Sequence, residues 1–130
     1  MDVGCGSGRD AVHLREHLGE GWRVVGVDNH GGALERGRQL ARDCGQEVIF
    51  AQANVRKRPL VECVAESVAE GAPESGGEPS QLQLVHGCRF LHLPLLEDLK
   101  RTLAPGGLIV WSTFLDGCEL IAPPLSLIHI

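Results

Sequence analysis

The sequence has 130 residues, of which 43% are hydrophobic and 22% are charged, and its formal net charge is −5. These values suit one domain with a packed core and exclude general disorder. The acidic balance argues against a broad nucleic-acid surface. Neither an apolar run of transmembrane length nor a secretory signal is present, so we expect a cytoplasmic protein without a membrane partner.

A glycine-rich stretch opens the sequence, with Gly4, Gly6 and Gly8 alternating with small residues after Asp2. Glycine permits positive φ and a close approach of the backbone to a ligand. Residues 11–18 then have helical periodicity. A helix that follows a glycine turn aims its free N–H groups and positive dipole end at a bound ligand. We therefore predict that this stretch is the cofactor loop of a nucleotide-binding α/β domain.

The first helix has start and stop signals at both ends. Ser7 and Asp10 fit the capping box, in which two side chains bond to free backbone N–H groups. Gly19 and Gly21 end the helix. A second amphipathic helix is predicted up to Cys44, with Gly45 as its C-cap.

A carboxylate follows the predicted second strand. Residues 23–27 form a short segment rich in β-branched residues, which predicts a strand. Asp28 comes directly after this segment, about 20 residues beyond Gly8. An ionised carboxylate accepts hydrogen bonds from both hydroxyls of a ribose. We predict that Asp28, with Asn29 beside it, binds ribose; the alternative is a helix cap or a solvated turn residue.

The rest of the chain predicts three more strands, at residues 47–51, 82–86 and 108–114. Residues 66–81 are rich in Gly, Pro, Glu and Ser, which indicates a mobile surface loop. A helix with an apolar stripe is predicted over residues 95–103. Alternation of strands and helices favours a doubly wound, mostly parallel sheet.

Residues beyond the fourth strand lie at the ligand edge of such a sheet. His86, Arg89 and His92 are found there, and a histidine has a suitable pKa for a base. Support of the loop or capping of the next helix is the favoured interpretation. We therefore assign no catalytic residue from the sequence.

Two motifs carry a resemblance to a known family. The acid-G-x-G-x-G string that begins at Asp2, and the Leu-x-Pro-Gly-Gly string of residues 103–107, resemble the class I S-adenosylmethionine-dependent methyltransferases. Residues 89–92, Arg-Phe-Leu-His, make the chain similar to the small tellurite-resistance-type branch. The resemblance covers most of residues 2–117 and implies the Rossmann-like class I methyltransferase fold, with five of the family's seven strands.

This resemblance implies a cofactor, S-adenosyl-L-methionine, and a set of binding residues. The loop of Asp2, Gly4, Gly6 and Gly8 would hold the methionine end, and Asp28 the ribose. The family often has an Ala-Asp-hydrophobic string after the third strand, whose acid accepts from adenine. This chain has Asn54 followed by Val55. An amide oxygen also accepts that bond, and a turn asparagine is the alternative.

The resemblance also sets an expected domain organisation. We expect a methyltransferase domain over residues 1–117 and a truncated or non-native tail over residues 118–130. Few apolar residues precede the glycine turn, so we also expect the start of the first strand to be missing.

The implied function is methyl transfer to an unidentified acceptor. One alternative is a nicotinamide-dependent oxidoreductase, against which the glycine spacing argues, because dinucleotide folds use G-x-G-x-x-G. The other is a non-catalytic cofactor-binding or interaction fragment. The sequence predicts neither the acceptor nor the oligomeric state.

No metal site is predicted. The five cysteines contain no C-x-x-C pair and indicate neither a zinc knuckle nor a disulfide framework; reduced thiols are the simplest account. Residues 13–17 match H-x-x-E-H, a zinc-protease string. This string lies directly behind the glycine turn and has no third-ligand segment, so we interpret it as a solvated helix face.

Overall fold

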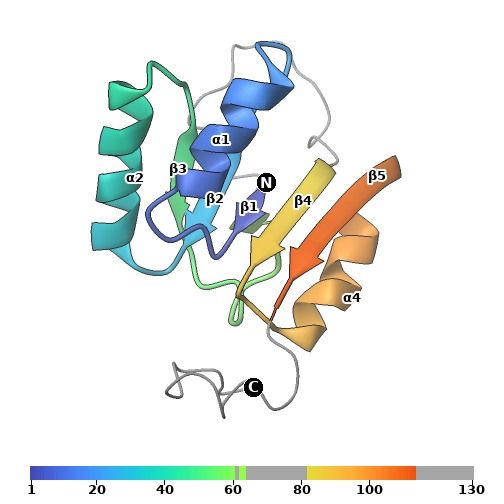
Figure 1. The fold of residues 1–130 in the computed structure, drawn as a ribbon. Coiled ribbons are helices and arrows are strands. Elements are labelled where there is room, and N and C mark those ends of the chain that lie inside the picture. The colour runs from blue at the N-terminus through green and yellow to red at the C-terminus, as the bar shows by residue number, and fades with distance from the viewer. Residues whose placement is uncertain (61, 64–81, 114–130) are drawn as a thin grey trace.

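A computed structural model describes residues 1–60, 62–63 and 82–113. These residues form a five-stranded sheet of order β3-β2-β1-β4-β5 (Figure 1). Every strand pair is parallel, which confirms the Rossmann-like doubly wound fold. The predicted loop at 66–81 and the predicted tail at 118–130 lie outside the described residues. The elements are β1 (Asp2–Val3), α1 (Arg9–Leu18), β2 (Val25–Asp28), α2 (Gly31–Asp43), β3 (Ile49–Gln52), β4 (Leu82–Cys88), α4 (Leu93–Thr102) and β5 (Leu103–Ser112).

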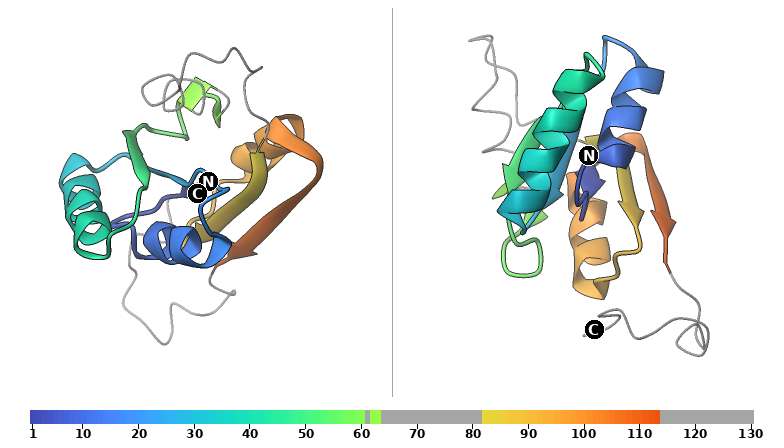
Figure 2. Two further views of the ribbon diagram at one scale, coloured as in Figure 1. Left: turned by 90° about the horizontal axis from the view of Figure 1, so that it is seen from above. Right: turned by 60° about the vertical axis from the view of Figure 1, so that its left-hand side comes forward.

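The sheet lies between two helical layers. Helices α1 and α2 cover one face and α4 covers the other (Figure 2). Each face has its own apolar core, because each strand of a parallel sheet is buried on both sides. One core packs Val12 of α1 and Leu34 of α2 against Phe50. The other packs Leu95 and Leu99 of α4 against the central strands. None of the described helices has the length and apolar character that crossing a bilayer requires.

The shortest strand, β1, occupies the centre of the sheet. Asp2 pairs with Gly26 of β2 on one side and with His86 of β4 on the other. The strand order reverses at this point, and parallel strands place all their carboxyl ends at one edge. Ligands of open α/β sheets bind at such a switch point.

Helix α1 begins later than the sequence predicted. Gly8 is its N-cap, with φ of 74°, and no side chain caps the helix. The predicted capping box of Ser7 and Asp10 is therefore wrong, because the left-handed Gly8 stands where the box needs an extended Ser or Thr. At the end of α2 the C-cap is Cys44, one residue before the predicted Gly45, which follows it with φ of 64°. The amide of Gly45 donates to the Arg42 carbonyl and that of Gln46 to Ala41, as in a Schellman motif.

Strand β5 also differs from the prediction. It starts at Leu103, and the predicted turn at residues 104–107 lies inside it. Leu82 pairs with Leu103, whereas Leu84 pairs with Leu108. One residue of β4 therefore faces four residues of β5, and the extra residues form a bulge. Gly106, with φ of 79°, supplies the left-handed backbone that bulges often need.

Two glycines let α1 and α2 approach the ring of Phe50 closely. A Cβ atom on Gly8 would lie 2.5 Å from Phe50 Cε1, and one on Gly37 would lie 2.8 Å from the same atom. Real Cβ atoms do not come so near to a ring. The three residues form a contact, called here the glycine notch, that sets the distance between the two helices and β3.

Gly37→Ala tests the glycine notch. Alanine normally stabilises a helix by about 1 kcal/mol over glycine, but overpacking here should outweigh that gain and lower the free energy of unfolding by about 1 to 2 kcal/mol. The measurement is urea unfolding. Gly21→Ala is the control, because nothing lies within 4 Å of its added Cβ. A Gly37→Ala chain more stable than the parent would contradict the notch.

Candidate functional site

A cavity of about 440 Å³ opens at the carboxyl ends of β1 and β4. It lies where the strand order reverses, which is the expected place for a ligand. The glycine turn and the start of α1 form one wall, and the end of β4 forms the other. The cavity is lined by Asp2, Gly4, Cys5, Gly6, Ser7, Arg9, Asp10, Cys88 and Arg89.

The glycine turn is fixed to β2 by backbone hydrogen bonds. The amides of Gly4 and Cys5 donate to the Val27 carbonyl at 2.8 and 3.0 Å. Gly4 and Gly6 have φ of 69° and 54°, a left-handed backbone that disfavours other residues. The sequence thus dictates a tight turn that is held under the cavity before any ligand enters.

Asp28 joins the turn to β2 through its side chain. Its Oδ2 accepts from the Gly6 amide at 2.9 Å, and its Oδ1 accepts from the His30 amide at 2.8 Å. A carboxylate has about four acceptor positions, so capacity for two hydroxyl groups remains. The neighbouring Asn29 is exposed, and its carbonyl accepts from Gln52 Nε2 at 3.2 Å.

Asp2 is the buried charge of the site. Its residue is only 2% exposed. Oδ1 lies 2.8 Å from Nδ1 of His86, its register partner on β4. Oδ2 is buried and has no hydrogen-bond partner among the described residues. Burial raises the pKa of Asp2 above its ordinary 3.8, and the His86 hydrogen bond opposes that rise. An unpaired buried acceptor is costly, so Oδ2 is suited to a donor from a ligand.

The cavity holds charges of both signs. Asp10 lies in the first turn of α1, and it shares the cavity lining with Asp2, Arg9 and Arg89. Arg89 has φ of 54°, which is uncommon for any residue but glycine. Acidic and basic residues around one cavity suit a zwitterion, such as the amino-acid end of S-adenosylmethionine. The residues present therefore fit that group.

Cys5 is a half-buried thiol whose setting disfavours the thiolate. Burial raises the pKa of its thiol to about 12, and the nearby Asp2 and Asp28 add to the effect. Only a thiolate is strongly nucleophilic. Cys5 therefore serves as a small wall residue of the cavity.

The structure brings together part of the predicted site. Asp2, Gly4 and Gly6 line the cavity, and Asp28 is bonded to Gly6. The buried Gly8 packs against Phe50, and its amide donates to the Cys5 carbonyl at 2.9 Å. Outside the cavity lining are Gly8, Asp28, Asn29, Asn54 and Val55.

Asn54 has a local role. Its Oδ1 accepts from the Arg56 amide at 3.0 Å, which is an Asx turn. One lone pair of that oxygen stays available. Val55 is half-buried and packs against the core under α4.

Several lining residues were missed by sequence reasoning. Cys5 and Ser7 stand between the predicted glycines, and Arg9 and Asp10 follow them directly. A residue between such glycines must lie near the ligand, so its position in the motif could have predicted that it lines the cavity. For Arg89 the sequence predicts only a position near the ligand edge.

Another hollow, of about 460 Å³, lies between α1, α2 and the starts of β2 and β3. It contains arginines, but two of them are already paired: Arg38 and Arg42 contact Glu35 at 3.3 and 3.6 Å. It is at the amino ends of the strands, opposite the expected ligand edge. We do not assign a ligand to it.

Comparison with known proteins gives a family and a fold. A family model described as "Methyltransferase domain" matches residues 1–107. The PH0226 protein from Pyrococcus horikoshii OT3 aligns with a TM-score of 0.60 and 22% identity over 92% of this chain and 47% of its own. A structure from work on the conversion of a disulfide bond into a thioacetal group during echinomycin biosynthesis aligns with a TM-score of 0.66 and 22% identity.

That second alignment covers 92% of this chain and 46% of the other. The chain thus spans just under half the length of either solved structure. At this identity the likeness shows the fold alone. No curated protein sequence gives a match.

The burial of Asp2, opposed by its hydrogen bond with His86, predicts a pH dependence of stability. The folded-state pKa of Asp2 is raised above 3.8, so its contribution to stability is full below 3.8 and is lost as pH rises through the folded-state pKa. His86→Leu removes the hydrogen bond and should raise this pKa further. Titration of the Asp2 carboxyl carbon by NMR measures both values.

His92→Leu is the control for that titration, because it removes a histidine at the N-cap position of α4, whose side chain makes no capping hydrogen bond, and leaves the Asp2 pair intact. Two results would contradict this account of the Asp2 pKa: a value at or below 3.8, or a value that His86→Leu does not change.

Proposed function

The chain belongs to the methyltransferase domain family, and we propose that it binds S-adenosyl-L-methionine at the carboxyl ends of β1 and β4 and transfers the methyl group to an acceptor. The observation that carries the proposal is the buried Asp2 Oδ2, which lacks a partner among the described residues and belongs to a residue of the cavity wall.

The proposal assigns each charged group at the methionine end of the cofactor to a group of opposite charge in the site. Asp2 Oδ2 accepts from the ammonium group of the methionine end, with Asp10 as a second nearby acid. Arg9 and Arg89 attract the carboxylate at the same end. Opposite charges matched in a partly dehydrated pocket give both affinity and orientation.

The remaining predicted residues serve the nucleoside. Asp28, with Asn29 beside it, binds the two ribose hydroxyls through the acceptor capacity that its two amide contacts leave. Asn54 Oδ1 accepts from the adenine amino group with its second lone pair, and Val55 offers an apolar contact to the ring. Gly4 and Gly6 keep the turn low enough for the cofactor to lie above it, and Gly8 holds that turn against Phe50.

Methyl transfer from a sulfonium needs little acid–base catalysis by the protein. When bound, S-adenosyl-L-methionine would supply a methyl group already activated for transfer, and Asp2, Arg9 and Arg89 would hold its methionine end. The contribution of this chain is alignment of donor and acceptor, which alone accounts for a large part of a barrier. We therefore propose no catalytic base.

We also propose that the chain falls in the small tellurite-resistance-type branch of the family. The string from Arg89 to His92 supports this placement, and Arg89 of that string lies in the cavity wall. The acceptor is not specified by these residues.

Calorimetric titration with S-adenosylhomocysteine is the first test. We expect saturable binding, and no binding of NADH, because the glycine turn differs from the dinucleotide pattern. Asp2→Asn and Asp28→Ala should each weaken binding about 10- to 100-fold, as expected for loss of a charge-assisted hydrogen bond. Asp2→Asn should unfold at the same temperature or higher at pH 7, because it removes a buried charge.

A folded chain that binds NADH and ignores S-adenosylhomocysteine would overturn the proposal in favour of an oxidoreductase. If Asp2→Asn binds S-adenosylhomocysteine as tightly as the parent chain, the cofactor assignment stands and the role of Asp2 is refuted. Thermal unfolding of each variant separates lost binding from lost fold.

Arg89→Gly separates charge from strain. Glycine accepts the φ of 54° without the penalty of about 1 kcal/mol that a side chain incurs there, so this variant should be at least as stable as Arg89→Ala. Both variants should bind S-adenosylhomocysteine several-fold more weakly, as expected for loss of an exposed charge. Arg101→Gln, an exposed position on α4, is the control, and equal affinity in all four chains would refute the role of Arg89.

A further inference from the structure

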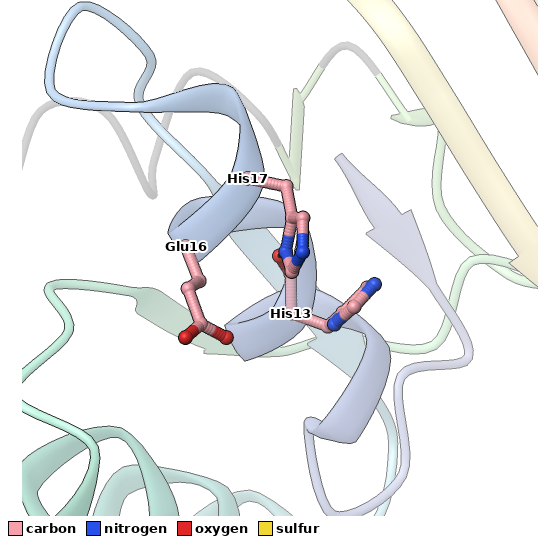
Figure 3. Close-up of side chains that lie close together, drawn as sticks. All are labelled: His13, Glu16 and His17. Carbon is pink, nitrogen blue, oxygen red and sulfur yellow. The ribbon is translucent and has the colours of Figure 1, made fainter.

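Three metal-binding side chains gather on the outer face of α1. His13, Glu16 and His17 are all exposed, and one ligand atom of each lies within 4.8 Å of those of the other two (Figure 3). Positions three and four apart share one face of a helix. The helix geometry therefore holds two imidazoles and one carboxylate together without help from any other element.

The ring of His17 is held by a hydrogen bond within the helix. Its Nδ1 lies 2.9 Å from the His13 carbonyl oxygen, a contact in which the ring nitrogen is the donor. This bond fixes the tautomer and makes Nε2 an acceptor, for which the described residues show no partner. Metal-binding histidines usually have their other ring nitrogen held in this way.

The two imidazoles lie close together before any ion arrives. Their ring centroids are 4.0 Å apart with an interplanar angle of 40°. Side chains that are already near each other lose less conformational entropy when they bind a shared ligand. Figure 3 shows the three side chains leaving neighbouring turns of α1.

We propose that His13, Glu16 and His17 bind one Zn²⁺ ion through two imidazole nitrogens and one carboxylate oxygen. Two nitrogens and one oxygen are a common donor set for zinc, with water at the remaining position. Calcium and magnesium prefer ligand sets made only of oxygen atoms. The set of two nitrogens and one oxygen therefore favours zinc over these two ions. Exposure, which the sequence predicted for this face, gives the ion free access.

The zinc site is separate from the proposed cofactor site. The cavity takes Arg9 and Asp10 from the first turn of α1, whereas the three zinc ligands come from later turns and do not line it. The proposal therefore stands or falls without the methyltransferase assignment.

The test is titration of the full, reduced chain with Zn²⁺ in competition with a chromophoric chelator. We expect one equivalent to bind. His13→Gln and His17→Gln should each weaken that binding by roughly tenfold or more, and the double variant should lose the equivalent, because each imidazole supplies a strong bond. Cys44→Ser is the matched control, since it removes an exposed thiol and should change nothing.

Two outcomes overturn the zinc proposal. One is a zinc equivalent that survives in the double histidine variant, and the other is one that disappears in Cys44→Ser. A second measurement guards against misfolding: Zn²⁺ should raise the thermal midpoint of the parent chain and leave that of the double variant unchanged. Binding of S-adenosylhomocysteine should be the same in both chains.

Discussion

A carboxylate buried in the centre of a parallel sheet is the constraint on which the rest of this structure depends. Asp2 belongs to the shortest strand, yet that strand pairs on both sides. A charge at such a place is tolerated only with a partner, and the register of β1 against β4 supplies His86. The glycine turn starts two residues later, so the position of the charge and the position of the turn are fixed together.

Most of the fold followed from local patterns in the sequence. The order of strands and helices, the glycine turn and the Schellman end at Gly45 are set by neighbouring residues, which a single sequence displays. Asp28 was found by its distance from the glycines, and it does contact the turn through Gly6. Its binding of ribose, like the roles of Asn29, Asn54 and Val55, stays a prediction.

The features that escaped prediction depend on contacts between distant segments. Helix α1 starts after Gly8, where an added Cβ would clash with Phe50 of β3, 42 positions further along the chain. The start of β5 is decided by pairing with β4 across a bulge. The bond between Asp2 and His86 joins residues 84 positions apart. Local periodicity does not reveal which distant residues contact each other. The sequence therefore showed Asp2 and His86 but not the hydrogen bond between them.

The glycine notch also bears on how this domain is able to change over evolutionary time. Gly8, Gly37 and Phe50 come from three different segments, and each is acceptable only because of the size of the other two. A larger residue at either glycine would need a smaller one in place of the ring, and the φ of 74° at Gly8 limits even that exchange. Substitutions at these three positions are therefore linked. A single substitution at one of them gives a less stable protein until a second substitution compensates for it. The glycine that a motif search attributes to the cofactor is in this way retained by the packing of two helices.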